Sequence, residues 1–433
     1  MSAAENDYVD TWYARTLADP DTRHAPLAGA AETEVAVVGG GLAGLSTALE
    51  LARRGRAVTL LEAQRVGWGA SGRNGGSVSP AFSAGADQIR RHVSESHYQS
   101  LYRLSMEGVE IIRDNIAALG ITEAHKVDGR LRVLRHEGTE ELQRWCDEQR
   151  SVFGREVSVL SRAQVRERLV SDVYFQGIDD PGSFHFHPLN YARALARECV
   201  RLGVRIHEGS AVNAAALAGP VKRLATAQGT LEAAQVVLAT GGYTEGVVPR
   251  LRRAMLPIAT YIMLTEPLGE RVREAIRTDA AIGDTRRAGN YYRVLPGGRI
   301  GWGSRITTRI SDPPDLAESL RRELLSVYPQ LQGLRVDAAW SGRMAYARHL
   351  MPQIGRLGEG VWYCTAFGGH GMNTTSIGGR VVAEGITGES ERYRLFEPFG
   401  LAWNGGPFGT AAVQLTYWSY QARDWLRERQ ARG

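Results

Sequence analysis

The clearest hydrophobic pattern lies between residues 34 and 62, where two apolar runs flank a glycine-rich turn and an amphipathic segment. The run at 35–38 has the length of a buried strand, and apolar residues then recur at helical spacing from Leu45 to Ala52. A second apolar run at 57–61 follows. The pattern therefore predicts a strand, a helix and a second strand, the order of a βαβ unit.

Glycines occupy the turn between the first strand and the helix. Gly39, Gly41 and Gly44 have the G-x-G-x-x-G spacing, which permits a tight turn, close approach to a pyrophosphate and close packing of the helix. Glu62 ends the second strand, where a carboxylate accepts hydrogen bonds from ribose hydroxyls and repels a 2′-phosphate. The unit therefore predicts a site for FAD or NAD rather than for NADP.

Helical and strand-like patterns alternate in the rest of the chain. Residues 87–119 and 139–153 predict helices, whereas 129–134 predicts a strand. Strand-like runs between 250 and 339 indicate an antiparallel sheet. Residues 361–388 repeat the order strand, glycine turn and helix.

The number of glycine turns separates FAD from NAD. Turns at 39–44, 240–242 and 368–371 each follow a buried strand, and a glycine-rich loop lies at 71–76. A nicotinamide enzyme needs only the first turn, whereas an extended FAD can use all four. N–H groups at the start of a helix near Gly371 would stabilise negative charge on the N1–C2=O edge of a reduced flavin.

Composition and charge exclude several classes of protein. The 433 residues are 43% hydrophobic and 23% charged, which is ordinary for two or three globular domains. The net charge of +5 comes from basic residues interleaved with acids, so we predict solvated faces and no nucleic-acid partner. No segment reaches the roughly 18 apolar residues of a membrane span, and the first residues lack the apolar core of a signal peptide.

The spacing of the cysteines and histidines does not match a metal-binding motif. The three cysteines are widely spaced, which argues against a disulfide framework or a cysteine metal site and favours the cytoplasm. His185 and His187 share one face of a predicted strand, as a metal pair could. Because no third ligand is nearby, we predict a packing role for them and no metal site.

Four motifs, GGGLAGLSTALELARRG, GASGRNGG, ATGGY and AFGGHGMNTTSIGGRVVAEGI, resemble those of the FAD-dependent amine and amino-acid oxidase superfamily, which includes glycine, sarcosine and D-amino-acid oxidases. The resemblance spans nearly the whole chain. Through GWGASGRNGG, WSGRMAYARHLMPQIGRLG and FGLAWNGGPFGTAAVQLTYWSYQARDWL, the chain is most similar to the bacterial γ-glutamylputrescine oxidase group.

This resemblance implies a fold that combines α/β and α+β classes, with a Rossmann-like FAD-binding domain interleaved with an antiparallel-sheet substrate domain. We predict an arm at 1–32, an FAD-binding domain at 33–86, 186–250 and 340–390, a substrate domain at 87–185 and 251–339, and a tail at 391–433 that packs on the body.

The resemblance also implies an FAD-dependent oxidoreductase that acts on CH–NH2 or CH–NH donors. Hydride would pass from the carbon beside a small neutral amine to flavin N5, and the imine would hydrolyse to an aldehyde. Suitable substrates include γ-glutamylated polyamines such as γ-glutamylputrescine, and the electron acceptor would be oxygen or another molecule. The alternatives are a D-amino-acid or N-methyl-amino-acid dehydrogenase that reduces a quinone or carrier, and a non-catalytic flavin-binding regulatory protein.

Some members of the superfamily attach FAD covalently through a histidine in the early glycine loop or a cysteine before the last turn. Arg73 and Met344 occupy these places, so we predict non-covalent FAD. The predicted FAD contacts are Gly39, Gly41, Leu42, Ala43, Gly44, Glu62, Ala63, Gly69, Ala70, Ser71, Arg73, Asn74, Gly75, Gly76, Ser77, Val212, Thr240, Gly241, Gly342, Met344, Gly368, Gly369, His370, Gly371 and Met372.

Candidate catalytic and substrate residues lie near the last turn and on the predicted cover sheet. Sarcosine oxidases use a lysine near the flavin to activate oxygen, but neither Lys126 nor Lys222 lies in a matching segment. Arg73, the helix terminus or His370, whose ring could instead be structural, would then supply positive charge, or the electrons would pass to an acceptor other than oxygen. The catalytic candidates are His370, Arg73 and Tyr291, and the substrate-binding candidates are Tyr292, Arg293, Arg305 and Arg343, because arginine suits a carboxylate.

Overall fold

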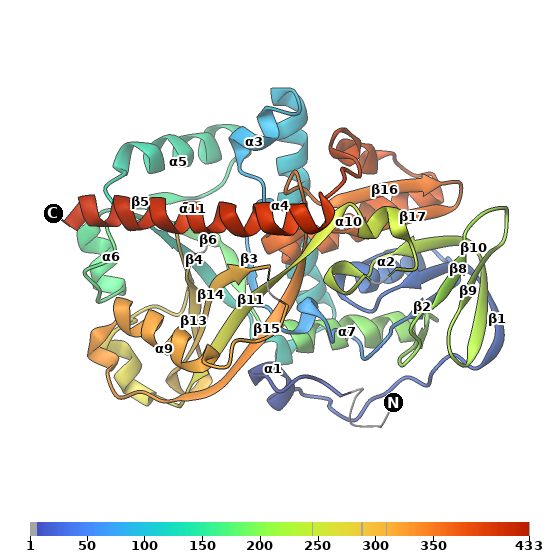
Figure 1. Ribbon diagram of the computed structural model, residues 1–433, viewed down its shortest axis with the longest axis horizontal. Coiled ribbons are helices and arrows are strands. Elements are labelled where there is room, and N and C mark those ends of the chain that lie inside the picture. The colour runs from blue at the N-terminus through green and yellow to red at the C-terminus, as the bar shows by residue number, and fades with distance from the viewer. Residues whose placement is uncertain (1–6, 245, 287–288, 309, 433) are drawn as a thin grey trace.

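Two large β-sheets, which we call sheet A and sheet B, form the body of the protein (Figure 1). The computed structural model describes residues 7–244, 246–286, 289–308 and 310–432, and the side chains of Arg305 and Arg432 lie outside this description. The cofactor motifs predicted from the sequence lie mainly at the strand ends and loops between the two sheets.

Sheet A consists of β1 (Gly29–Val38), β2 (Val58–Leu61), β7 (Arg205–His207), β8 (Ala214–Ala216), β9 (Lys222–Ala225), β10 (Gly229–Leu238), β16 (Gln353–Gly358) and β17 (Val361–Thr365). Its central strands β17, β10, β1, β2 and β7 are parallel neighbours in this order. β16 pairs antiparallel with β17, and the β8–β9 hairpin pairs antiparallel with β10. The first apolar run of the sequence is therefore the central strand β1.

Both faces of β1 are covered, which explains its uninterrupted apolar run. Val35 and Val37 belong to a hydrophobic core that includes residues of α2 (Leu42–Arg53), α4 (Glu95–Ala118), α7 (Pro188–Arg201) and α10 (Gly371–Thr387). Ala36 and Val38 point to the other face, where they join a core with Leu224 of β9 and Met255. Alternate side chains of one strand thus enter two different cores.

Sheet B consists of β3 (Ser77–Val78), β4 (Val127–Val133), β5 (Ser158–Leu160), β6 (Gly177–His185), β11 (Met255–Thr265), β12 (Ala281–Asp284), β13 (Tyr291–Leu295), β14 (Arg299–Thr307) and β15 (Val336–Ala347). Most neighbours in it are antiparallel, and β12 and β4 are parallel. One face packs on α9 (Leu316–Val327), where Trp302 and Tyr328 are fully buried.

The remaining helices are α1 (Trp12–Arg15), α3 (Ala86–Arg90), α5 (Thr139–Phe153), α6 (Arg162–Arg168), α8 (Pro249–Arg252) and α11 (Gly406–Arg432). The predicted single helix at 87–119 is wrong, because it is two helices, α3 and α4. Ser94 interrupts it: its backbone is extended, and its hydroxyl accepts the N–H of His97 and caps α4.

The parallel sheet A and the largely antiparallel sheet B confirm the predicted combination of a Rossmann-like part and an antiparallel-sheet part. The predicted domain boundaries remain a proposal. Within the described residues, no helix is both long enough and apolar enough to cross a membrane.

Helix α10 crosses α2 at a point of very close backbone contact. A Cβ placed on Gly379 of α10 would lie 2.6 Å from the backbone nitrogen of Thr47 and 2.7 Å from the side chain of Ser46. Both of these residues are buried in α2, and one contact is with backbone, so the neighbours cannot move aside cheaply. Glycine is therefore the residue that allows this crossing.

We predict that Gly379→Ala lowers the free energy of unfolding by about 1–3 kcal/mol, the usual cost of overpacking a core. Denaturant unfolding followed by circular dichroism measures the change. Gly85→Ala is the control, because Gly85 has a negative φ and a Cβ there meets nothing within 4 Å. Equal stability of the two variants would contradict the proposed crossing.

Candidate cofactor and substrate site

A cavity of about 1260 Å³ lies between the two sheets. The carboxyl ends of β1, β2 and β10 open into it, and so do the first residues of α2 and α10. Strands β13, β14 and β15 of sheet B form another part of its wall. Ligands of parallel α/β sheets bind at such carboxyl ends.

The first glycine turn brings the start of α2 and Glu62 together. A Cβ on Gly39, whose φ is +111°, would lie 2.6 Å from the carbonyl oxygen of Ala239, and one on Gly44 would collide with the carbonyl of Gly39. The backbone N–H of Gly40 donates to the Glu62 carboxylate at 2.5 Å, and that of Gln64 donates to its other oxygen at 2.8 Å. Glu62 is thus held in place beside the turn.

Burial raises the pKa of the Glu62 carboxyl, and the N–H groups of Gln64 and Gly40 oppose this shift. Because each carboxylate oxygen has further lone pairs, Glu62 can still accept hydrogen bonds from a ligand in the cavity. Its position suits the ribose contact that the sequence predicts.

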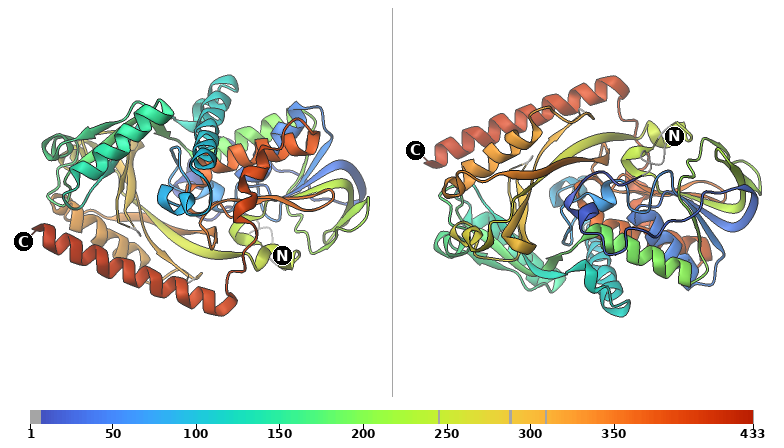
Figure 2. Two further views of the ribbon diagram at one scale, coloured as in Figure 1. Left: turned by 90° about the horizontal axis from the view of Figure 1, so that it is seen from above. Right: turned by 90° about the horizontal axis from the view of Figure 1, so that it is seen from below.

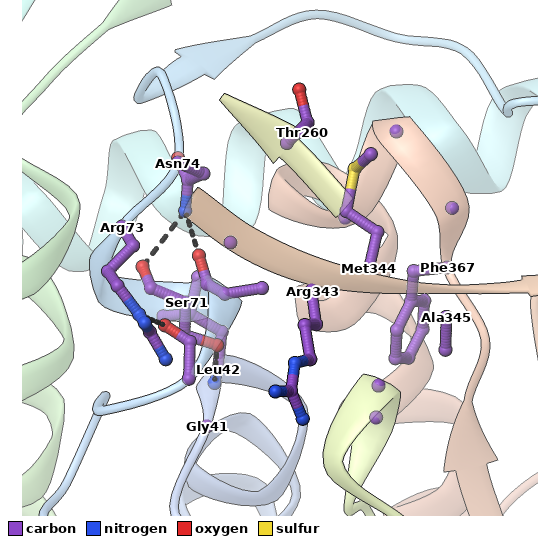
Figure 3. A pocket seen from close by; sticks show the side chains of 18 of the residues that line it. Gly41, Leu42, Ser71, Arg73, Asn74, Thr260, Arg343, Met344, Ala345 and Phe367 are labelled. Carbon is purple, nitrogen blue, oxygen red and sulfur yellow. Dashed lines mark hydrogen bonds between the residues drawn. The ribbon is translucent and has the colours of Figure 1, made fainter. Parts of the chain in front are cut away.

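The glycine-rich loop at 71–76 is closed by Asn74 (Figure 3). Its amide donates to the carbonyl oxygens of Ala70 at 3.0 Å and Ser71 at 2.9 Å, while its own oxygen accepts the N–H of Gly76 at 2.7 Å. The Ser71 hydroxyl in turn accepts the N–H of Leu42 at 2.9 Å. These bonds join the loop to the N-terminus of α2.

The last glycine turn leads into α10. The N–H of Gly369 donates to the Ser83 hydroxyl at 2.7 Å, and Gly368 has a φ of +59°, which glycine adopts easily. Gly371 and Met372 begin α10 and line the cavity. N–H groups in the first turn of a helix have no partner within the helix, so this end attracts negative charge.

A cluster of aromatic and arginine side chains lines the cavity beside the loop. Arg73 donates to the Tyr243 hydroxyl at 2.6 Å, and its guanidinium carbon lies 4.5 Å from the centre of the Trp68 ring. The guanidinium carbon of Arg343 lies 5.5 Å from the Tyr243 ring centre. Burial lowers the pKa of Arg73. Neither arginine forms an ion pair with any residue that the structure describes.

The side chain of Tyr291, which begins β13 of sheet B, lies against the glycine-rich loop. A Cβ on Gly75 would lie 2.9 Å from its ring, and one on Gly303 would collide with the same ring. The Tyr291 hydroxyl lies 3.1 Å from the hydroxyl of Thr260, and burial raises its pKa to about 12. Tyr291 is therefore a neutral phenol on the cavity wall at physiological pH.

The side chains of two predicted substrate residues, Tyr292 and Arg293, make contacts within the protein. Tyr292 stacks on Trp302 with ring centres 4.4 Å apart, in the core beneath α9. Arg293 donates to Nδ1 of His185 at 2.7 Å, with two further donations to the carbonyl oxygen of Phe186 and the hydroxyl of Tyr13. We therefore leave Tyr292 and Arg293 out of the proposed substrate site. Arg305 belongs to β14, and its side chain lies outside the description.

His185 and His187 serve the fold. Nδ1 of His185 accepts from Arg293 and its Nε2 lies 2.8 Å from the carbonyl oxygen of Asp279, while Nδ1 of His187 accepts the N–H of Asn190 at the start of α7. Burial lowers the pKa of both rings to about 3, so both are neutral. In the described part of the chain, no three metal-ligating side chains come together.

Arg130 of β4 lines the cavity, although the sequence analysis did not select it. Its guanidinium donates to the Ser79 hydroxyl at 2.7 Å, and burial lowers its pKa. Burial, followed by the charges of Arg130 and Arg132, lowers the pKa of His370 to about 4. Among the described residues, Arg130 has no ion-pair partner. The alternation of GRLRVLR was visible in the sequence, but only the strand register shows which arginine lines the cavity.

Most of the predicted cofactor and catalytic residues line the cavity. Every predicted FAD contact except Gly44 lines it, and so do Tyr291, Tyr292, Arg293 and Arg343. Gly44 instead packs α2 against the turn. Polar wall residues that the sequence did not predict include Ser79, Ser83, Arg130, Tyr243, Thr260, Asp284, Arg286, Asp312, Tyr346, Tyr417 and Tyr420.

These residues fit an FAD molecule. The cavity joins a carboxylate held for ribose hydroxyls at Glu62 to the positive N-terminus of α10, and the N-terminus of α2 also opens into it. At Gly41 a Cβ would lie 2.9 Å from the Ser71 hydroxyl, so larger residues would fill this part of the turn. The donor set suits the pyrophosphate and ribose groups of a dinucleotide.

Comparison with known proteins agrees with this site. The chain is 32% identical over 404 residues to a probable oxidoreductase, OrdL, of Haemophilus influenzae, and the match covers 92% of each chain. It is also 32% identical over 366 residues to the gamma-glutamylputrescine oxidoreductase of Escherichia coli, which covers 84% of this chain and 85% of that protein.

Solved structures show the same fold. Glycine oxidase from Geobacillus kaustophilus superposes with a TM-score of 0.73 at 21% identity, covering 86% of this chain and 99% of that chain. L-proline dehydrogenase from P. horikoshii gives a TM-score of 0.72 at 20% identity, with 86% and 98% covered. Residues 34–385 match the family described as FAD dependent oxidoreductase, and the chain belongs to this family of enzymes that act on amines and amino acids.

Proposed function

We propose that the chain oxidises the C–N bond of an amine that also carries a carboxylate, and that a γ-glutamylated polyamine such as γ-glutamylputrescine is its substrate. The carrying observation is Arg130, a half-buried guanidinium in the cavity wall that forms no ion pair with a described residue. Asp180 stands opposite it on β6, but its carboxylate pairs with Arg155. A buried guanidinium is costly unless an anion meets it. A substrate carboxylate would supply that anion through the planar fork of arginine.

The relationship to the Escherichia coli gamma-glutamylputrescine oxidoreductase supports this choice of substrate. A γ-glutamyl group carries a free α-carboxylate at some distance from the terminal amine, so Arg130 would hold one end while the amine carbon reaches the flavin. D-Amino-acid dehydrogenases are more distant relatives, at 24% identity over 430 residues for one from Methylobacterium radiotolerans. An amino-acid substrate is the second candidate, because it also carries a carboxylate.

FAD, when bound, supplies the hydride acceptor at N5 for oxidation of the amine to an imine, which then hydrolyses to an aldehyde. The first glycine turn and Glu62 would hold its adenosine and pyrophosphate, and the N-terminus of α10 would face negative charge at the other end. Tyr291, as a neutral phenol, would shape the cavity wall and exclude water. His370 is neutral above about pH 5 and would not compete with the substrate amine as a cation.

Positive charge for reaction with oxygen would come from Arg73, Arg343 or the N-terminus of α10. Lys126 pairs with Asp128 at 2.5 Å, and Lys222 is buried in β9, so the two lysines lie outside the cavity wall. We keep both oxygen and another electron acceptor in the proposal, together with the cytoplasmic location predicted from the sparse cysteines. All three cysteines are buried and unpaired.

The proposal is tested by anaerobic mixing of the FAD-loaded protein with candidate amines while the flavin absorbance is followed. We expect γ-glutamylputrescine to bleach the flavin much faster than putrescine, which lacks the carboxylate. Faster bleaching by D-amino acids would replace the first candidate substrate with the second, and no bleaching by any amine would contradict both. Release of peroxide in air then identifies oxygen as the acceptor.

We predict that Arg130→Gln raises KM for a carboxylate-bearing substrate about 10- to 100-fold, because a charge-assisted hydrogen bond of about 1.5–3 kcal/mol is lost. Steady-state kinetics with γ-glutamylputrescine and putrescine measure the effect, which should be absent with putrescine. Arg132→Gln is the matched control, since Arg132 lies two residues further along β4, over the Trp145 ring and outside the cavity wall. An equal effect of both variants would refute the role of Arg130.

We also predict that FAD is bound without a covalent bond, because Arg73 and Met344 stand where some relatives carry the attaching histidine and cysteine. Precipitation of the holoprotein with acid, followed by centrifugation, should leave all flavin absorbance in the supernatant. Yellow colour that stays with the precipitated protein would show a covalent link and overturn this prediction.

A further inference from the structure

The C-terminal helix α11 lies along an outer edge of the molecule, where it is seen lengthwise in both views of Figure 2. Its 27 residues make a helix of about 40 Å at 1.5 Å per residue. One side of the helix contacts the body: Glu428 is buried and ion-paired with Arg286 and Arg135, and Gln414 accepts hydrogen bonds from Thr307 and Thr308. The opposite side faces solvent.

The solvent side of α11 carries large apolar side chains, which an ordinary surface helix turns toward the core. Its exposed fractions are 83% for Phe408, 60% for Leu415, 58% for Trp418, 57% for Trp425 and 50% for Leu426. Single exposed hydrophobic residues are common on proteins, but a row of five large ones on a single helix marks a binding surface.

Helical geometry arranges these side chains in an ordered way. At about 100° per residue, Phe408, Leu415 and Leu426 lie within about 20° of one another along the centre of the exposed side. Trp418 and Trp425 flank this centre on one side, and Arg423 flanks it on the other. An apolar centre with tryptophans at its margin and arginine on the polar side is typical of helices that lie in a membrane interface.

The charges on α11 indicate the kind of partner. Arg423, Arg427 and Arg429 are exposed, and none of them forms an ion pair with another described residue. The two carboxylates of the helix face the other way, because Glu428 is buried and Asp424 is half-buried. The exposed side therefore carries only positive charge. A partner that covers it must supply negative charge over the C-terminal half and accept apolar side chains along the whole length.

We propose that the exposed side of α11 docks on an anionic membrane surface. Phe408, Leu415, Trp418, Trp425 and Leu426 enter the boundary between headgroups and acyl chains, and the three arginines contact lipid phosphates. The helix lies in the plane of the membrane and does not cross it. This agrees with the finding that no helix of the described residues is long and apolar enough to span a membrane. A second copy of the chain that docks through its own α11 fits less well, because that helix offers no exposed carboxylate to these arginines.

The test uses the full-length protein with bound FAD and measures its co-sedimentation with vesicles. We expect strong binding to vesicles of equal parts phosphatidylcholine and phosphatidylglycerol, weak binding to phosphatidylcholine alone, and weaker binding at high salt. Arg423→Gln and Arg427→Gln should each lower the affinity for anionic vesicles about fivefold. Trp418→Ser combined with Leu426→Ser should reduce it further, because the apolar contact is removed.

Two control substitutions test whether binding to vesicles is specific to the exposed side of α11. Arg91→Gln removes an exposed arginine at the end of α3, and Val221→Ser removes an exposed apolar residue before β9, so both should leave vesicle binding unchanged. FAD content and melting temperature show that each variant is folded. The proposal is overturned by equal binding to neutral and anionic vesicles, by no binding to either, or by a stable dimer in light scattering that dissociates in the Trp418→Ser, Leu426→Ser variant.

Discussion

Close approach of backbone to backbone at a few glycines is the constraint on which the rest of the structure depends. Helix α2 can start at its turn because Gly44 leaves room for the carbonyl of Gly39, and α10 can cross α2 because Gly379 lies 2.6 Å, measured from an ideal Cβ, from the backbone of Thr47. At Gly242, a Cβ would lie 2.7 Å from the carbonyl oxygen of Arg343, so sheet A and sheet B also meet through a glycine. These close backbone contacts bring the N-termini of α2 and α10 to the same cavity, where both can face an anionic ligand.

The buried arginines of the protein include two groups, those that pair with a carboxylate and those that bond a hydroxyl in the cavity. Arg135 is buried and pairs with Asp284 at 2.7 Å and with Glu428 of α11, so its desolvation is offset by carboxylates within the protein. Arg73 and Arg130 face the cavity, and each hydrogen-bonds a hydroxyl instead of a carboxylate. Because burial lowers the pKa of both, an anion that enters the cavity gains more from them than it would from exposed arginines.

The sequence was enough to predict the glycine turns and the class of fold, because their signals are local. A G-x-G-x-x-G turn between a strand and a helix is one continuous segment, and the structure agrees with it from Gly39 to Glu62. The substrate wall was harder to predict, because it depends on strand register. Tyr291 faces the cavity and Tyr292 the core beneath α9, so a shift of one residue would exchange their roles.

Helix α11 connects the membrane-docking surface to the substrate cavity. Tyr417 and Tyr420 line the cavity from the inner side of this helix, while Trp418, one residue from Tyr417, is turned about 100° around the helix and is exposed to solvent. The contacts that hold α11 to the body include those of Gln414 with Thr307 and Thr308, and of Glu428 with Arg286 and Arg135. A surface that binds α11 only in its docked position stabilises that position. We therefore expect membrane docking to order the wall that Tyr417 and Tyr420 form, so that occupancy of the membrane and of the cavity favour each other.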